Sequence, residues 1–264
     1  MNVIEHFYLA IPLDFENFTI FRSRQISNHT IFENLAQITY PHPSYVTAFG
    51  RCNFPGQSVF YGANGIETTL LEWKIGDDDA ACGAQFQSKE GKITLVTIGE
   101  IDHFRRYGGK VMFETPGLKE RIEHIVMALN EHARRVFFFV DAYVADFFRA
   151  VPGIDEGYIY EFTARFAKFL FDHEHVDGIS YPSIRHLGGI NVAIKPERFD
   201  KKFELVKFFF TTKIFSYGLG IFEFYVHTYG DKTKGDGELI WLPVHVIGGT
   251  PVPARATIPY VRPT

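Results

Sequence analysis

Residues 50–72 read GRCNFPGQSVFYGANGIETTLLE, and this stretch decides the expected fold. Pro55-Gly56 indicates a turn, and the β-branched and aromatic run from Ser58 to Tyr61 is typical of a short strand. Asn64, with Glu67 three residues later, predicts a capping box at the start of a helix. The stretch is therefore predicted to form a turn, a strand, a second turn and a helix.

Three side chains with useful chemistry lie on successive elements of this stretch: Arg51 in the turn, Tyr61 in the strand and Glu72 in the helix. A compact strand–helix unit could aim all three into one cleft. The residue types also allow plainer roles, since Arg51 could be a loop arginine, Tyr61 a core tyrosine and Glu72 a solvated helix position. A second segment of the chain is needed to decide between these roles.

The composition predicts a globular protein with a large core. The chain has 264 residues, of which 46% are hydrophobic and 16% aromatic, enough for one large domain or two small ones. Its formal net charge of -4 gives no reason to expect direct nucleic acid binding. The many phenylalanines could serve a homo-oligomer interface, but core packing is the simpler interpretation.

Several features predict a soluble, cytoplasmic protein without a membrane segment. The first residues, MNVIEHFYLAIPLDFE, carry acidic side chains where a signal peptide needs a basic start. No apolar run approaches the ~20 residues that span a bilayer. The two cysteines, Cys52 and Cys82, are too few for a disulfide framework and favour a reducing compartment.

Helical and strand patterns are mixed along the chain without a regular βαβ alternation, which predicts an α+β fold. One helix is expected to open at Thr115-Pro116, with Thr115 as its cap and Pro116 at its first position, and another to run from about Tyr158 to His173. The wholly apolar run Val136–Val140 is interpreted as a buried strand. The C-terminal part is predicted to contain strands at residues 203–210 and 221–229, and the second of these is expected to form a β-hairpin with residues 238–247.

The sequence offers two further arginines and lacks several motifs that are typical of metal sites, phosphate loops and nucleophilic serines. Arg22 and Arg24 are two residues apart, so a strand would carry both on one face. The sequence has no zinc pattern, no Gly-rich phosphate loop and no Gly-x-Ser-x-Gly elbow. The acidic run at residues 77–79 is interpreted as a solvated turn. We therefore expect no metal ion, and Cys52 is interpreted as a packing residue.

Specific blocks of the sequence resemble the RES domain, a family named after its Arg, Glu and Ser residues. The central block comprises Gly50–Gly56, Val59–Ala63 and Thr69–Glu72. The block with the serine comprises Gly178–Arg185, Gly189 and Asn191–Ala193. The early arginine of the family matches Arg22, with Arg24 as an equal candidate. The resemblance covers a core at about residues 20–200 of a single domain, 1–264, and leaves residues 201–264 as an extension.

The resemblance implies a fold and an activity. RES proteins are similar in fold to ADP-ribosyltransferases, so we expect a mixed β-sheet core with flanking helices, followed by the C-terminal β-hairpin extension. The family implies NAD+ as substrate and cleavage of the bond between nicotinamide and ribose, by hydrolysis or phosphorolysis. Many members are intracellular toxins paired with a helix-turn-helix antitoxin of the Xre type. Others are described as transferring ADP-ribose to a protein.

The residue types suit this reaction. Arg51, helped by Arg22 or Arg24, could hold the phosphates, because a guanidinium offers a planar fork of donors. Tyr61 could stack on the cationic nicotinamide ring. Glu72 could stabilise the positive charge that develops on the ribose. The predicted catalytic residues are thus Arg51, Glu72 and Ser183.

Alternatives remain open at two positions in the serine block, and for the whole chain. Ser183 could hydrogen-bond the ribose or carboxamide of NAD+, or it could cap the segment that follows it. Arg185 could be structural or could face the ligand. The chain as a whole could transfer ADP-ribose to a protein, or could be a non-catalytic interaction module that binds a partner through residues 201–264.

Overall fold

The computed structural model describes residues 2–26, 31–73, 80–151, 153, 157–216, 222–243, 246–247, 250–251 and 254–258. The acidic run at residues 77–79, predicted as a solvated turn, lies outside them. The helices are α1 (Asn2–Phe7), α2 (Ile66–Glu72), α3 (Glu100–Arg106), α4 (Leu118–Ala128), α5 (Glu131–Arg149), α6 (Gly157–Phe171) and α7 (Pro196–Lys202). Within the described residues, none of these is long and apolar enough to cross a membrane.

The strands form one large sheet and a separate small pair. The large sheet contains β1 (Pro12–Phe15), β2 (Thr19–Ile26), β3 (Phe60–Ala63), β4 (Ala80–Ser88), β5 (Ile93–Thr97), β6 (Gly178–Pro182), β7 (Ile190–Ile194), β8 (Phe203–Ser216), β9 (Phe222–Gly230), β10 (Leu242–Pro243) and β13 (Ala254–Ile258). The pair consists of β11 (Val246–Ile247) and β12 (Thr250–Pro251).

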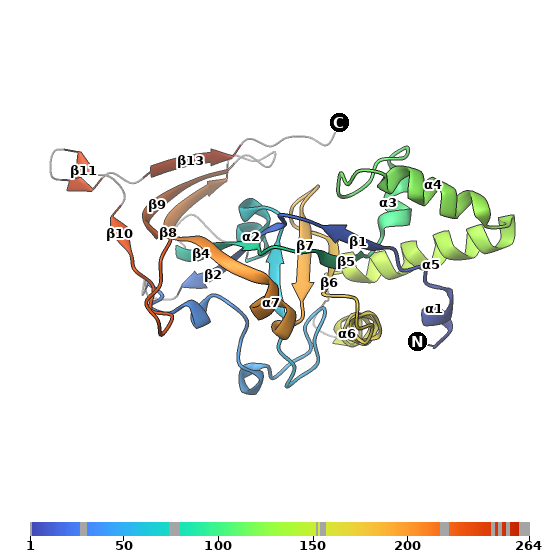
Figure 1. Ribbon diagram of the computed structural model, residues 1–264, viewed down its shortest axis with the longest axis horizontal. Coiled ribbons are helices and arrows are strands. Elements are labelled where there is room, and N and C mark those ends of the chain that lie inside the picture. The colour runs from blue at the N-terminus through green and yellow to red at the C-terminus, as the bar shows by residue number, and fades with distance from the viewer. Residues whose placement is uncertain are drawn as a thin grey trace.

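The large sheet is mixed, which confirms the predicted α+β fold. Its order is β1-β5-β6-β7-β3-β2-β4-β8-β9-β10, and β13 adds to β9. The β5–β6 pair runs parallel, while β6–β7, β7–β3 and β2–β4 run antiparallel. Helices α3, α4 and α5 gather at one end of the molecule, and β8 and β9 lie at the other (Figure 1).

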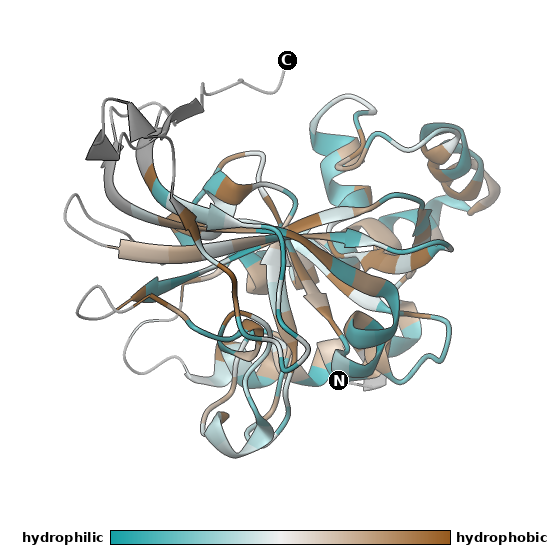
Figure 2. Cartoon of the chain, turned by 60° about the vertical axis from the view of Figure 1, so that its left-hand side comes forward, coloured by the Kyte–Doolittle hydropathy of each residue, from teal (hydrophilic) through white to brown (hydrophobic). Residues whose placement is uncertain are grey.

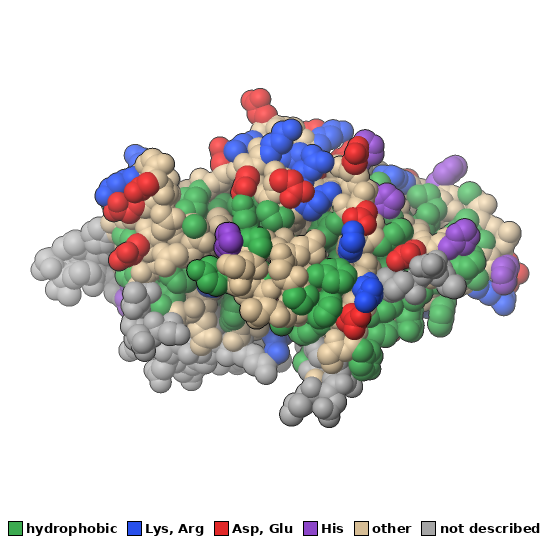
Figure 3. Space-filling model, turned by 90° about the horizontal axis from the view of Figure 1, so that it is seen from below, with side chains coloured by type: hydrophobic (Ala, Val, Ile, Leu, Met, Phe, Trp, Pro, Cys, Tyr) green, Lys and Arg blue, Asp and Glu red, His purple; other side chains and the backbone are tan. Residues whose placement is uncertain are grey.

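Two hydrophobic clusters pack on opposite sides of β3, because successive side chains of a strand alternate between faces. Phe60 packs with Phe86 and Phe208 in one cluster. Tyr61 packs on the other cluster, which includes Phe148 of α5 and Phe166 of α6. Hydrophobic residues are concentrated on the central strands (Figure 2). On the face in Figure 3, acidic and basic side chains intermingle beside a more hydrophobic area.

The run Val136–Val140, predicted as a strand, lies inside helix α5, so that prediction was wrong. The Asn130 side chain accepts a hydrogen bond from the Ala133 amide and caps the helix at its first turn. Val140 is buried, whereas Phe139 is 67% exposed, as expected on a helix with one buried face. A five-residue apolar run cannot by itself distinguish a strand from part of a longer helix.

The helix α6 confirms the expected helix near residues 158–173. A helix is also present after Thr115-Pro116, but the predicted Thr115 cap was wrong, because α4 begins at Leu118 after Gly117 without a side-chain cap. The capping box at Asn64 was wrong, because α2 begins after Gly65 without a side-chain cap. The Asn64 side chain instead accepts a hydrogen bond from the Ile190 amide of β7 at 3.0 Å. Asn64 therefore fixes the start of α2 against the sheet.

The strands predicted at residues 203–210 and 221–229 are present as β8 and β9, which are antiparallel neighbours and form a C-terminal hairpin. The third predicted strand appears as the short β10, in which Leu242 pairs with Tyr229 of β9. On its other side, β8 pairs with β4 from Phe203 to Thr212. The extension thus continues the same sheet that carries the core.

Candidate functional site

The Glu72 carboxylate brings together two segments that are far apart in the sequence. Glu72 ends α2, Ser183 directly follows β6, and Asn191 lies in β7. The Ser183 hydroxyl donates to Glu72 Oε1 at 2.7 Å, and the Asn191 side-chain amide donates to the same oxygen at 2.8 Å. Within the part of the chain that the structure describes, Glu72 Oε2 accepts no hydrogen bond. Among the described residues, one carboxylate oxygen is therefore held in place by two donors while the other has none.

The Ser183 hydroxyl also organises the loop that follows it. Its oxygen accepts hydrogen bonds from the amides of Arg185 at 3.2 Å and His186 at 3.1 Å. The His186 ring lies 2.7 Å from the Thr68 hydroxyl of α2 (Nδ1 to Oγ1). The capping alternative for Ser183 is thus realised in the structure, and the hydroxyl proton is directed to Glu72.

Tyr61 has a buried and fully engaged hydroxyl. The hydroxyl donates to Asn53 Oδ1 at 2.8 Å and accepts from the Cys52 amide at 2.7 Å. Burial raises the pKa of Tyr61 well above its usual value, so the phenol is neutral. Cys52 is also buried, and burial raises the pKa of its thiol, which suits the packing role predicted for it.

Arg51 lies at the C-terminal end of α5. Its guanidinium donates to the carbonyl oxygens of Phe147, Phe148 and Ala150, at 3.2, 2.6 and 3.1 Å. It also lies over the Tyr160 ring, 5.4 Å from the centroid. The last carbonyls of a helix lack partners within the helix, and a cation there also complements the helix dipole. Arg51 was expected to hold phosphate, yet three of its N–H groups here hold a helix end.

Arg22 and Arg24 share a face of β2, as their spacing predicts, but their guanidinium groups contact different segments of the chain. Arg22 donates to the Tyr61 carbonyl oxygen and lies over the Phe60 ring. Burial, with a smaller effect from the Arg24 charge, lowers the pKa of Arg22 to about 9. Arg24 donates to the Gln37 carbonyl oxygen at 2.6 Å. Of the two, Arg22 is the one tied to the strand that carries Tyr61.

Five of the six predicted residues therefore fall into three groups. Glu72 and Ser183 form one hydrogen-bonded unit, Arg51 and Tyr61 flank the Cys52 turn, and Arg22 adjoins Tyr61 from β2. Arg24 is the member whose contacts lead elsewhere. Among the described residues, no cluster of three or more His, Cys, Asp or Glu side chains is arranged to hold a metal ion.

Asn191 is a site residue that was not predicted from the sequence. It is a polar residue in the otherwise apolar strand β7, whose sequence is INVAI, and it is 9% exposed. Buried polar side chains usually have a hydrogen-bond partner, so this position was the available signal. Its partner, Glu72, is 119 residues away in the sequence and could not be found by spacing.

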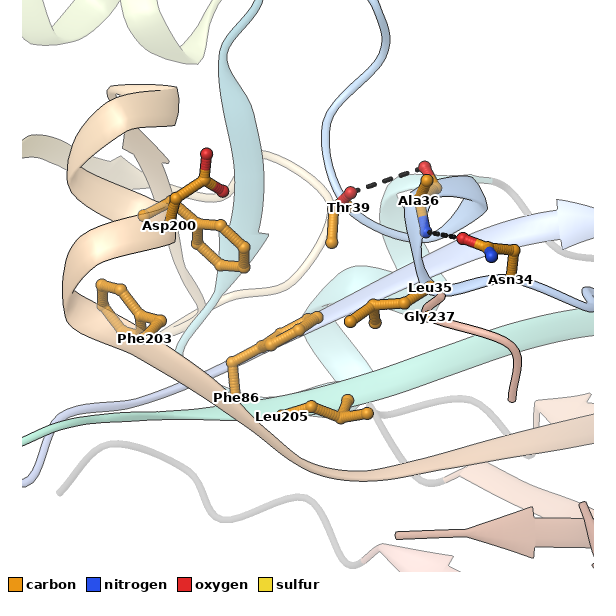
Figure 4. A pocket seen from close by; sticks show the side chains of 10 residues that line it. Asn34, Leu35, Ala36, Thr39, Phe86, Asp200, Phe203, Leu205 and Gly237 are labelled. Carbon is orange, nitrogen blue, oxygen red and sulfur yellow. Dashed lines mark hydrogen bonds between the residues drawn. The ribbon is translucent and has the colours of Figure 1, made fainter. Parts of the chain in front are cut away.

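A pocket of about 380 Å³ lies apart from these residues, between the segment 34–39, α7 and the start of β8 (Figure 4). Its lining is mainly apolar and includes Phe86, Phe203 and Leu205. Asp200 at its edge accepts a hydrogen bond from the Tyr40 hydroxyl at 2.6 Å. None of the predicted site residues lines this pocket, so it does not belong to the site around Glu72.

The family model described as RES domain matches residues 20–207 of the chain. The matched range contains every candidate residue described above. Neither the curated proteins nor the solved structures gave a significant match.

Proposed function

Because the chain belongs to the RES domain family, which is associated with enzymes that act on NAD, we propose that it consumes NAD+ by cleaving the bond between nicotinamide and ribose. The observation that carries this proposal is the Glu72 carboxylate, which Ser183 and Asn191 hold through one oxygen. A carboxylate with one free oxygen suits a reaction that develops positive charge on a sugar carbon.

Glu72 is proposed to face the anomeric carbon of the nicotinamide ribose. As the bond from this carbon to the nicotinamide nitrogen breaks, its electron pair leaves with nicotinamide, which becomes neutral. The positive charge that remains on the ribose is stabilised by Glu72 Oε2. A water or phosphate oxygen then bonds to the anomeric carbon, and attacking water loses a proton to the solvent or to the carboxylate.

The other residues are proposed to prepare this step. Ser183 and Asn191 position the carboxylate, since their donors both reach Oε1. The hydroxyl of Tyr61 is fixed by Asn53 and Cys52, so its ring is held ready to stack on nicotinamide. These assignments are supported by geometry and by the family, and each is open to a separate test.

Arg51 and Arg22 are proposed to support the wall of the site. Arg51 fixes the turn before β3 to the end of α5 through its three carbonyl contacts. Arg22 fixes β2 to the backbone of Tyr61. We propose no contact between Arg24 and NAD+, because its guanidinium contacts Gln37 and the Phe32 ring.

The family also supports a proposed biological role. The protein would act in the cytoplasm as a toxin that depletes NAD+, and a helix-turn-helix protein of the Xre type would be its antitoxin. Transfer of ADP-ribose to a protein is the alternative outcome, because the same ribose cation can be captured by a protein side chain.

Product analysis tests the proposal directly. Purified protein is incubated with NAD+, with and without inorganic phosphate and with a cell extract, and the products are separated by chromatography. Free nicotinamide with ADP-ribose indicates hydrolysis, and a phosphorylated ADP-ribose indicates phosphorolysis. ADP-ribose found on extract proteins indicates transfer. Intact NAD+ under all three conditions would refute the proposed activity.

A further inference from the structure

The proposed substrate contains a diphosphate, yet the arginines first expected to hold it are engaged elsewhere. Arg51 donates to three carbonyl oxygens at the end of α5. Arg22 donates to the Tyr61 carbonyl oxygen, and Arg24 to that of Gln37. A phosphate would have to compete with these main-chain contacts or use the remaining N–H groups.

Arg185 differs from these three arginines. In the described part of the chain its guanidinium has neither a hydrogen-bond acceptor nor a carboxylate partner, although the residue is only partly exposed. Its backbone is nevertheless fixed, because its amide donates to the Ser183 hydroxyl oxygen at 3.2 Å. The same hydroxyl donates to Glu72 at 2.7 Å. The main chain of Arg185 is thus anchored by one hydrogen bond to the serine that holds the Glu72 carboxylate, while its guanidinium has no partner among the described residues.

The chemistry of NAD+ requires a phosphate-binding group close to this carboxylate. The ribose that carries nicotinamide on its anomeric carbon carries the diphosphate on its C5′ oxygen. A protein that places a carboxylate beside the anomeric carbon must therefore also accommodate the phosphate oxygens, which lie only a few covalent bonds away. An arginine can hold such oxygens through two parallel hydrogen bonds, which a lysine cannot reproduce.

The loop that carries Arg185 is held in place at both ends. The Ser183 amide donates to the Gly189 carbonyl oxygen at 2.8 Å, and the Gly189 amide donates to the His186 carbonyl oxygen at 2.9 Å. A Cβ atom at Gly189 would lie 2.6 Å from the Thr68 hydroxyl oxygen, so the loop packs closely on α2. This fixed loop would present Arg185 with little loss of backbone entropy on binding.

We propose that Arg185 is the residue that binds the diphosphate of the substrate, in place of Arg51. The inference rests on the proposed function for its ligand, and it assigns the anion-binding role to the loop of residues 183–189. The Arg185 side chain makes no hydrogen bond to the residues that the structure describes, so its removal is expected to leave the fold intact.

Binding of ADP-ribose to the full chain, measured by calorimetry, tests this assignment. Arg185→Ala should weaken ADP-ribose binding about 10- to 100-fold, as expected when a hydrogen-bonded charged contact is lost. Arg185→Lys should retain part of the affinity, because it keeps the charge but not the fork. Arg135→Ala is the matched control, since it removes the same charge from a side chain that is 77% exposed on α5.

A second ligand separates diphosphate binding from a general effect on the site. Nicotinamide riboside has the same ribose and nicotinamide but no phosphate, so its affinity should be equal in Arg185→Ala and the wild type. The assignment is overturned if Arg185→Ala binds ADP-ribose like the wild type, or if both ligands are weakened equally. If Arg185→Ala binds ADP-ribose more weakly than the wild type but the wild type leaves NAD+ intact, the proposed reaction is refuted and the assignment of Arg185 stands.

Discussion

Replacing Arg51 tests whether this arginine supports the fold or holds the substrate. In Arg51→Ala, three carbonyl oxygens at the end of α5 lose a charged donor, and the stacking on Tyr160 is lost. Hydrogen bonds to charged groups are worth about 1.5–3 kcal/mol each, but water can replace part of them at this half-buried position. We therefore expect a total loss of about 2–4 kcal/mol in the free energy of unfolding.

Arg51→Lys refines this test, because the lysine keeps a cation at the helix end but cannot reach three carbonyls at once. It should lose about half as much stability as Arg51→Ala. Urea unfolding followed by circular dichroism measures both variants, and ADP-ribose binding is measured below the unfolding transition. The reasoning is refuted if Arg51→Ala unfolds within about 0.5 kcal/mol of the wild type. Loss of ADP-ribose binding with unchanged stability would show instead that Arg51 contacts the diphosphate.

Three further predictions concern other positions. Asn191→Ala removes one of two donors to Glu72 Oε1. The kcat for NAD+ consumption should therefore fall about 10-fold or more while KM changes little. A normal kcat would exclude the positioning role. Gly189→Ala would place a Cβ atom 2.6 Å from the Thr68 hydroxyl oxygen and displace the loop of residues 183–189. The rate of NAD+ consumption should therefore drop. A fully active variant would show that the loop can shift without loss of activity. Burial raises the pKa of Glu100 from 4.5 to about 7, which means that the folded state favours the protonated carboxyl. The stabilising effect of Glu100 is therefore present at low pH and is lost as the pH rises through about 7. The urea midpoint of Glu100→Gln is compared with that of the wild type at each pH. The difference should favour the variant more at alkaline than at acidic pH, and a pH-independent difference would contradict the assignment.

The sequence predicted the features that depend on local pattern. The β-branched and aromatic run from Ser58 to Tyr61 located β3, and the helical pattern from about Tyr158 located α6. It failed at Val136–Val140, where a short apolar run belongs to a longer amphipathic helix that Asn130 caps. It failed also at Asn64, whose side chain bonds to Ile190 of a distant strand in place of its own helix. At Asn64 a partner far away in the sequence decided the outcome, whereas at Val136–Val140 the longer helix that contains the run decided it.

The site was predictable in its residue types but not in its contacts. The family resemblance identified Glu72 and Ser183, and the structure joins them across 111 residues of sequence. Nothing in the local sequence around Arg51 indicates that its guanidinium meets α5, because those partners lie 96 to 99 residues away. Asn191 was overlooked for the same reason. Long-range hydrogen bonds such as these follow from the sheet topology, which local periodicity does not define.

The rate of nicotinamide release by Glu72→Gln tests the central claim most directly. Glutamine keeps the size of the side chain and an oxygen that can accept from Ser183 and Asn191, but it removes the negative charge next to the proposed ribose cation. Glu131→Gln is the matched control, since Glu131 is 76% exposed on α5. We predict that Glu72→Gln releases nicotinamide about 100-fold or more slowly than the wild type, whereas Glu131→Gln is unaffected. A folded Glu72→Gln protein that releases nicotinamide at the wild-type rate would contradict the account.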